Sequence, residues 1–235
     1  MNPHRRTREM NPGTDERFGD SREATVALLH AWTRYAERWL YRLPGADGLL
    51  CYGTGAHGHW ALQAHDTAFT GYAMLATLPE GCGAAPHLSR DACAATALAL
   101  CRYTFQSHHD GGGAAADGQT WGHSWISVLG LERMMHGVRA IRPLLTDADR
   151  ERMRRVLLSE ADWLLTSYPV TAGLTQNNHP ESNMWNGTFL HRAARLYPDA
   201  PHAAEYREKG TSFLANAISL PEDAADGRLL DGRPL

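Results

Sequence analysis

Residues 121–125 read Trp121-Gly122-His123-Ser124-Trp125, a loop containing glycine and histidine that runs into a helix beginning with tryptophan. Two further stretches have the same form: Gly53-Thr54-Gly55-Ala56-His57-Gly58-His59-Trp60, and Asn177-Asn178-His179-Pro180-Glu181-Ser182-Asn183-Met184-Trp185-Asn186-Gly187. Trp60, Trp125 and Trp185 follow one another at steps of 65 and 60 residues. A near-constant period of this size predicts one supersecondary unit repeated along the chain. We expect that unit to be a helical hairpin with its chemistry gathered at one end.

The composition is that of a globular protein. The chain has 235 residues, 43% hydrophobic and 21% charged, which is enough to bury a sizeable core. Its formal net charge of −3 argues against a dedicated nucleic-acid-binding protein, which usually presents a basic face. Residues 1–20 are polar and lack the apolar segment of a signal peptide, so we expect a disordered lead-in. No later stretch is apolar enough to span a membrane. These features predict a cytoplasmic protein, with secretion as the alternative.

Apolar residues recur with the helical period through most of the chain, and no alternating strand pattern of comparable quality is present in the sequence. The predicted class is therefore all-α. The seven expected helices span residues 21–43, 60–78, 89–105, 124–141, 146–167, 180–197 and 202–220. Ser89 and Thr146 are the expected N-caps of the third and fifth helices, and Asp149 completes a capping box with Thr146.

The connections between these helices alternate in character. Those at 44–59, 106–123 and 168–179 are long or polar and contain Gly, His, Asn and Trp, whereas those at 143–146 and 198–201 are short and contain proline. In an antiparallel array of helices, alternate connections lie on opposite faces. We therefore expect the three polar loops to share one face. Loops on a rigid scaffold commonly carry binding and catalytic residues.

Repeated helical hairpins with polar loops on one face resemble the (α/α) toroid carbohydrate enzymes, which include the six-hairpin glycosidases and the heparinase II/III-like and alginate-lyase-like enzymes. Asn177-Asn178-His179 is similar to the Asn-His that meets the substrate carboxylate in several toroid lyases. The run 181–187 resembles the acidic-Asn-x-Trp-Asn motif of bacterial members of the heparinase-like group, and residues 51–63 resemble an N-terminal element of the same proteins. The resemblance implies a toroid of helical hairpins and activity on a glycan.

The domain organisation follows from the same resemblance. Residues 21–220 would form part of an (α/α)6-type toroid, with three hairpins and an unpaired seventh helix. Residues 221–235 read as the start of a further loop, which indicates an N-terminal fragment of a longer protein. An unpaired amphipathic helix needs a partner for its apolar face. We expect the rest of the same toroid, or a second subunit, to cover the open end.

The run of Asn177, Asn178 and His179 is the first catalytic candidate. A uronate lyase must neutralise the substrate carboxylate so that the neighbouring proton becomes acidic, and amide and imidazole donors at a helix N-terminus suit an anion. We expect Asn178 and His179 to be catalytic, with His179 also able to act as the base, and Asn177 to bind substrate. The alternative is a turn that caps the sixth helix.

Glu181 is the corresponding candidate for a hydrolase. Paired with Asp110 or Asp117, it could supply one of the two carboxylates that glycosidases place on either side of the scissile bond. The alternative, which we favour, is that Glu181 complements the dipole of the sixth helix in its first turn. Tyr52 and Tyr168 are the hydroxyls best placed for proton transfer, and either could instead be a half-buried loop anchor.

The remaining candidates are expected to line a sugar-binding cleft. Trp121 lies inside its loop and is expected to stack on a sugar ring, whereas Trp60, Trp125 and Trp185 are expected to anchor their hairpins in the core. Besides Asn177 and Trp121, the expected substrate-binding residues are His57, His59, His123, Asp110, Asn183 and Asn186.

A metal site is a further alternative for the histidines. His57, His59, His108, His109 and His123 could bind an ion together with Asp110, but their spacing defines no coordination geometry. The four cysteines likewise lack zinc-type spacing. We therefore expect no metal and no cofactor.

These residues together predict a carbohydrate-active enzyme that degrades a uronic-acid-containing glycan by β-elimination. A six-hairpin glycoside hydrolase with paired carboxylates is the nearest alternative. A non-catalytic helical-repeat module that binds a glycan or a protein is the third, because fold resemblance alone does not establish a reaction.

Overall fold

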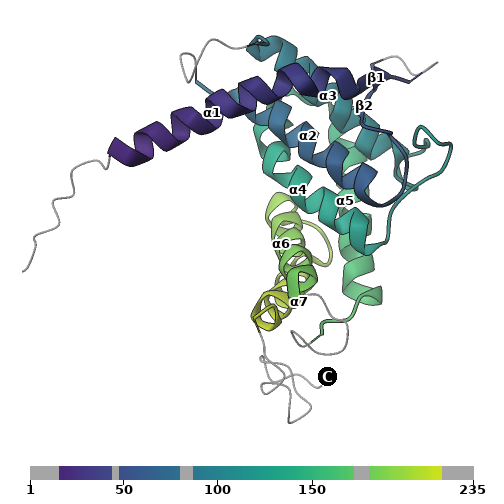
Figure 1. Cartoon of the computed structure of the whole chain (residues 1–235). Coiled ribbons are helices and arrows are strands. Elements are labelled where there is room, and N and C mark those ends of the chain that lie inside the picture. Colours follow the sequence, from purple (N-terminus) through teal and green to yellow (C-terminus); the bar gives the residue numbers. More distant parts are fainter. Residues whose placement is uncertain (1–15, 44–47, 80–86, 172–179, 219–235) are drawn as a thin grey trace, which may run out of the picture.

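The structure, a computed structural model, describes residues 16–43, 48–79, 87–171 and 180–218. These residues form seven α-helices and one two-stranded antiparallel sheet (Figure 1). The elements are α1 (Glu16–Ala36), β1 (Leu40–Arg42), β2 (Leu50–Tyr52), α2 (His59–Thr77), α3 (Arg90–Ser107), α4 (Trp125–Ile141), α5 (Asp147–Ser167), α6 (Pro180–Leu196) and α7 (Ala203–Asn216), with short 3-10 helices η1 (Glu37–Trp39) and η2 (Arg142–Leu144). The predicted all-α class is confirmed for this part of the chain.

Apart from α1, which contacts α2, the helices of the described residues lie in two rows. One row consists of α2, α4 and α6, with α4 packed against both of its neighbours (Figure 1). In the other row, α5 contacts both α3 and α7. The hairpin partners α2 and α3, and likewise α6 and α7, pack closely against each other. The three helices of the first row therefore run in the same direction and begin at the same end of the molecule.

The core lies largely between the two rows. Phe69 of α2, Leu131 of α4 and Phe189 of α6 are fully buried. The contact between α2 and α4 is close because α4 carries Gly137, where an added Cβ would lie 2.9 Å from Cε1 of Phe69. A methyl group at that position would push the two helices apart.

Helix starts agree with the cap predictions. Ser89 Oγ accepts a hydrogen bond from the Ala92 amide at 3.1 Å, and Thr146 and Asp149 form the expected capping box at the start of α5. The start of α4 has a further capping box, formed by Ser124 and Ser127. These caps fix where α3, α4 and α5 begin, and so set the length of the loop between α3 and α4.

The first predicted helix is wrong at its C-terminal end. It was expected to reach residue 43, but α1 ends at Ala36, and residues 40–42 pair with residues 50–52 as strands β1 and β2. The reason is tertiary: Cys51 is buried against Tyr103 and Ala115, and the His65 ring accepts the Tyr52 amide at 3.1 Å. These contacts favour a hairpin over a longer helix, so local periodicity does not decide the structure there.

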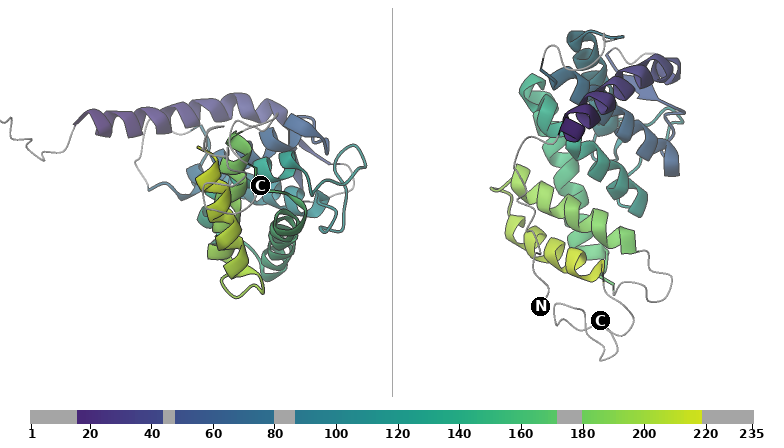
Figure 2. Two further views of the ribbon diagram at one scale, coloured as in Figure 1. Left: turned by 90° about the horizontal axis from the view of Figure 1, so that it is seen from below. Right: turned by 60° about the vertical axis from the view of Figure 1, so that its left-hand side comes forward.

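The terminal segments differ partly from expectation. Residues 16–20, expected in a disordered lead-in, belong to α1, which extends beyond the other helices (Figure 2). Residues 1–15 and the proposed further loop at 221–235 lie outside the described residues. None of the helices in the described ranges combines the length and apolarity that crossing a bilayer requires.

Candidate functional site

The first two polar loops meet at one end of the helix rows. His57 donates its backbone amide to the Asp117 carboxylate at 3.2 Å, and its Nδ1 lies 2.6 Å from the same carboxylate. The amide of Ala116 donates to the carbonyl of Gly55 at 3.0 Å, and the Tyr103 hydroxyl also donates to that carbonyl. The prediction that these two loops share a face is confirmed. His57 and Asp117 are thereby occupied with each other.

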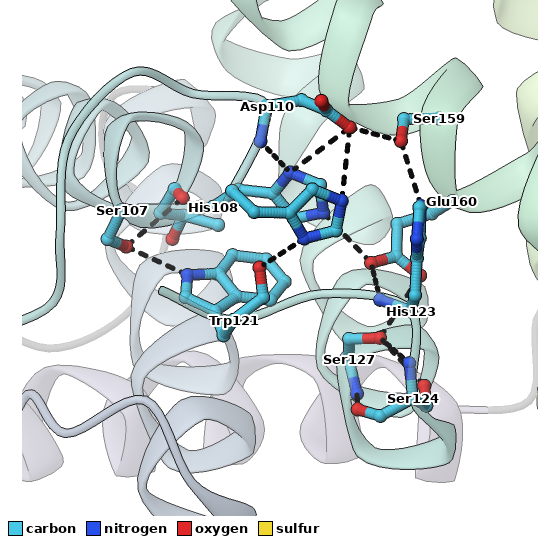
Figure 3. A network of polar contacts seen from close by, with 11 residues as sticks. Ser107, His108, Asp110, Trp121, His123, Ser124, Ser127, Ser159 and Glu160 are labelled. Atoms are coloured by element: carbon cyan, nitrogen blue, oxygen red, sulfur yellow. Dashed lines mark hydrogen bonds and ion pairs between the residues drawn. The ribbon is translucent and has the colours of Figure 1, made fainter. Parts of the chain in front are cut away.

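A buried carboxylate anchors the second loop to α5. Glu160 has no exposed surface, and its Oε1 accepts hydrogen bonds from His108 Nε2 at 2.9 Å and from the His123 amide at 2.7 Å (Figure 3). Its Oε2 accepts a third bond, from the Ser127 hydroxyl at 3.0 Å. A buried charge is tolerated only when it is well bonded, and three donors meet that condition here. Glu160 therefore ties the end of α3 and the start of α4 to α5.

The same network fixes the tautomer of His108. Its Nδ1 accepts the Asp110 amide at 3.0 Å, so the ring proton must lie on Nε2, which donates to Glu160. Burial lowers the pKa of His108 despite its acidic partner, in keeping with a neutral ring. Trp121 packs edge-on against this ring, with the two centroids 4.8 Å apart. His108 is therefore a structural residue with both nitrogens engaged.

His109 faces an oxygen on each side. Its Nδ1 donates to the Trp121 carbonyl at 3.0 Å, and its Nε2 lies 3.2 Å from Oδ2 of Asp110. The carbonyl and the carboxylate both accept hydrogen bonds, so each faces a ring nitrogen that can donate only when it carries a proton. The pair is partly exposed to solvent, which leaves it accessible to a ligand.

Asp110, Ser159 and His123 form a hydrogen-bonded chain (Figure 3). Burial opposes ionisation of Asp110, but the Ser159 hydrogen bond and the nearby histidines outweigh it, so the pKa of Asp110 lies below its usual range. The ionised Asp110 must accept, so the Ser159 hydroxyl donates to it. Ser159 Oγ then accepts from His123 Nε2 at 2.9 Å. It follows that the neutral His123 ring carries its proton on Nε2 and a free electron pair on Nδ1.

His123 is held in this position at a conformational cost. Its φ of 48° lies in the left-handed region, where no other non-glycine residue of the described chain lies. The hydrogen bond from the His123 amide to Glu160 and the ring contact with Ser159 enforce this backbone conformation. The ring stacks on Trp163, with centroids 5.8 Å apart and planes 4° from parallel. Such strain is typical of functional positions held by their surroundings.

The hydrogen-bonded chain of Asp110, Ser159 and His123 borders a pocket of about 890 Å³ beside α5. Asp110, His123, Ser159 and Trp163 line it, together with side chains of α5 and of the start of α7. The lining is mixed in charge: the others include Glu151, Arg154, Arg155, Asp162, His202 and Glu205. A pocket of this size suits a small ligand or one or two units of a polymer.

One group of three described side chains, His108, His109 and Asp110, could hold a metal ion by distance alone. Hydrogen bonding argues against it. Both nitrogens of His108 are engaged, which leaves His109 Nε2 and the Asp110 carboxylate as the only donors of that group. Zinc sites use three or four protein ligands, so these residues do not fit one.

Three of the four tryptophans with predicted roles are placed opposite to expectation, whereas Trp185 is half-buried and packs against the core as expected. Trp121 is 5% exposed and its indole N–H donates to Ser107 Oγ at 2.8 Å, so it cannot offer a ring face to a sugar. Trp60 and Trp125, expected in the core, are 64% and 40% exposed. Their ring centroids lie 6.0 Å apart, and Trp125 lies 6.3 Å from Trp185. The starts of α2, α4 and α6 thus form a Trp row, defined as Trp60, Trp125 and Trp185.

The site residues predicted on α6 and in the loop before it differ in where the structure places them. Asn177, Asn178 and His179 lie outside the described residues, so their proposed roles stay predictions. Glu181 is exposed on the first turn of α6, as dipole complementation would place it. Asn183 and Asn186 were expected to bind substrate, but both are buried, and Asn183 donates to the Thr171 carbonyl at 2.8 Å. Their side chains face the interior because they share a helix face with Leu190.

Two further candidates lie apart from the pocket. Tyr52 is half-buried, 6.3 Å from Trp32 between ring centroids, and lines a separate groove between α1 and α2. It does not belong to the cluster around His123. The side chain of His59 is outside the described set. Of the predicted residues, the structure brings together Asp110, His123 and Trp121, with Trp121 in a structural role.

The residues that α5 contributes to the site were not predicted from the sequence. Glu160 carried a signal: it lies at helical spacing on the apolar face that contains Val156, Leu157 and Leu164. A carboxylate on a buried face requires partners, and its position could have been recognised on that ground. Ser159 and Trp163 carry no such signal, because their importance depends on which loop packs against α5.

Replacing Glu160 with glutamine should lower the free energy of unfolding by about 2–3 kcal/mol, because the amide cannot accept from three donors as the carboxylate does. Urea denaturation followed by circular dichroism measures this. Glu205→Gln, an exposed change on α7, should alter stability by less than about 0.5 kcal/mol. Equal effects of the two substitutions would contradict the anchoring role of Glu160.

The chain was compared with known proteins at three levels. Neither a protein-family model, nor a curated protein, nor a solved structure matches it. Function is therefore inferred from the chemistry of the pocket and of the loop surface.

Proposed function

We propose that this chain is part of an (α/α) toroid enzyme that cleaves a uronic-acid-containing glycan by β-elimination, with His123 as the general base. The observation that carries the proposal is the Asp110–Ser159–His123 chain at the wall of an 890 Å³ pocket. This role replaces the one expected for His123, which was substrate binding. Asn178 and His179 could act beside it, as their sequence predicts.

The chain of hydrogen bonds suits proton abstraction. In β-elimination a base removes the proton from the carbon next to the carboxylate, and that electron pair forms a carbon–carbon double bond. The glycosidic oxygen leaves with the electrons of its broken bond and takes up a proton from water to become a hydroxyl group. His123 Nδ1 has the free electron pair to accept that proton. The negative charge of Asp110, one hydroxyl away, would stabilise the imidazolium that forms, as a carboxylate does behind a catalytic histidine.

The pocket also contains positive charge for the substrate carboxylate. Arg154 and Arg155 line it, and Arg155 Nε donates to the Asp110 carbonyl at 2.8 Å. A cation beside the carboxylate lowers the cost of forming negative charge on the neighbouring carbon. Arg154 is partly neutralised by Asp199 at 3.2 Å, so Arg155 is the better candidate for binding the substrate carboxylate.

The Trp row supports a carbohydrate as the ligand. Trp60 and Trp125 expose large apolar rings at the loop end of the molecule, where exposed aromatic rings mark binding surfaces. Sugar rings offer apolar C–H faces that pack on such rings. Trp125 is two residues from His123, so the row and the pocket share one loop. The two rows of antiparallel helices agree with part of a toroid.

Hydrolysis is less well supported, because a glycosidase needs one carboxyl group with a raised pKa to act as the acid. Hydrogen bonds and charges hold the pKa values of Asp110 and Asp117 below their usual range, although burial opposes this. Burial raises the pKa of Asp66 to about 7, but Asp66 is enclosed between Thr104 and Gly130 in the core. It cannot reach a substrate.

Replacing His123 with glutamine should lower the rate of elimination by about 10²–10⁴-fold, the usual contribution of a general base. The assay follows the ultraviolet absorbance of the unsaturated uronate released from uronic-acid-containing polysaccharides. His87→Gln, an exposed histidine bonded to Glu37 away from the pocket, is the matched control and should keep full activity. New reducing ends without new absorbance would instead identify a hydrolase and overturn the elimination mechanism.

Replacing Trp60 with alanine should weaken binding of an oligouronate by about 1–2 kcal/mol, or roughly five- to thirtyfold, because it removes an exposed ring of the Trp row. Calorimetry in the His123→Gln background measures binding without turnover. Trp39→Ala removes a ring of similar exposure, 60%, outside the row, and should leave affinity unchanged. Unchanged affinity in both variants would exclude the row as the sugar-binding surface.

A further inference from the structure

A second pocket lies at the opposite end of the first helix row. Its volume is about 430 Å³, and the C-terminal turns of α4 and α6, with η2, form its walls. Four arginines line it, namely Arg139, Arg142, Arg192 and Arg195, together with His136 and the apolar side chains of Met135, Val138 and Leu196. This concentration of positive charge stands out in a chain whose formal net charge is −3.

One of the four arginines is neutralised. Arg192 Nη1 lies 3.2 Å from the Glu132 carboxylate, which has only 10% of its side chain exposed. Arg192 Nη2 also donates to His136 Nδ1 at 3.4 Å, so that ring nitrogen carries no proton. Arg192 is therefore held in place as one wall of the pocket.

The other three arginines have no such partner. The guanidinium groups of Arg139, Arg142 and Arg195 form no hydrogen bond or ion pair with any residue in the described ranges. The adjoining surface does hold Asp147, Asp199 and Glu151, but Asp147 pairs with Arg150 and Asp199 with Arg154. Glu151 is the one carboxylate of that surface without a partner among the described residues, so three guanidinium groups that form no ion pair there line the pocket and a single acidic side chain lies beside it.

The helix dipole explains only part of this arrangement. A basic residue in the last turn of α4 or α6 is favourable because the helix C-terminus is negative. That effect acts on each helix separately, and it does not require arginines of two helices to converge on one pocket. Convergent arginines are characteristic of sites for phosphate, since the planar guanidinium donates two parallel hydrogen bonds to its oxygens.

We propose that this pocket binds the phosphate group of a small molecule, with Arg139, Arg142 and Arg195 holding the phosphate and Met135 and Leu196 contacting the rest of the ligand. A phosphate monoester carries a charge of about −1.5 to −2 at neutral pH, which three guanidinium groups can balance. This inference does not depend on the proposed lyase activity, because the pocket lies at the other end of α4 from His123.

Calorimetric titration with inorganic pyrophosphate tests the proposal, with potassium chloride at matched ionic strength as the blank. Arg139→Gln and Arg195→Gln should each raise Kd about tenfold or more, because each removes a charged hydrogen-bond donor. Arg195→Lys should recover part of the loss. Arg207→Gln removes an exposed positive charge from α7 and is the matched control, for which Kd should change less than about twofold.

Thermal unfolding of each variant without ligand checks the fold, and we expect midpoints close to that of the unmodified protein. Two results would overturn the proposal: no saturable binding of pyrophosphate at millimolar concentration by the unmodified protein, or equal weakening by Arg207→Gln and Arg195→Gln. A third arm uses vesicles containing phosphatidic acid. Binding to vesicles without binding to soluble pyrophosphate would also contradict the proposal, since it would assign the charge to a lipid surface.

Discussion

The buried carboxylate of Glu160 is the interaction on which the site depends. It accepts from His108, from the backbone of His123 and from Ser127, so one side chain of α5 fixes the end of α3, the intervening loop and the start of α4. Without Glu160 the ring N–H of His108 would be left unpaired in the interior, at a cost of about 1–3 kcal/mol, whereas the Ser127 hydroxyl could donate to the Ser124 carbonyl instead. Because Glu160 holds the buried side of the loop between α3 and α4, the exposed side of that loop can keep polar groups in a strained conformation.

The strained backbone of His123 serves to position its ring. Its left-handed backbone turns the ring toward Ser159 while its amide stays bound to Glu160, and Trp163 supports the ring face. The direction of each hydrogen bond then follows from the ionised Asp110. Nδ1 of His123 is left as an acceptor, which is what a general base requires. The remote arginine pocket shares only α4 with this arrangement, so the two ends of that helix are chemically distinct.

Much of the helical framework could be predicted from sequence, because apolar periodicity and caps are local signals. Ser89 and Thr146 begin their helices as expected, and the first two polar loops meet at one end of the molecule through His57 and Asp117. The rest depended on tertiary contacts. The hairpin at residues 40–52 forms because Cys51 is buried, which no local pattern shows. The exposures of the tryptophans, and the part played by Ser159, depend on which surfaces the loops cover.

The direction of hydrogen bonding in the Asp110–Ser159–His123 chain decides whether His123 can act as a base, and nitrogen-15 NMR of the histidine side chains reports it. Loss of one ring signal in His123→Gln assigns the residue. We expect the neutral His123 ring to carry its proton on Nε2, and Ser159→Ala to abolish that preference. A neutral ring protonated on Nδ1 would contradict the proposed role of His123, because Nδ1 would then be a donor and could not accept a substrate proton.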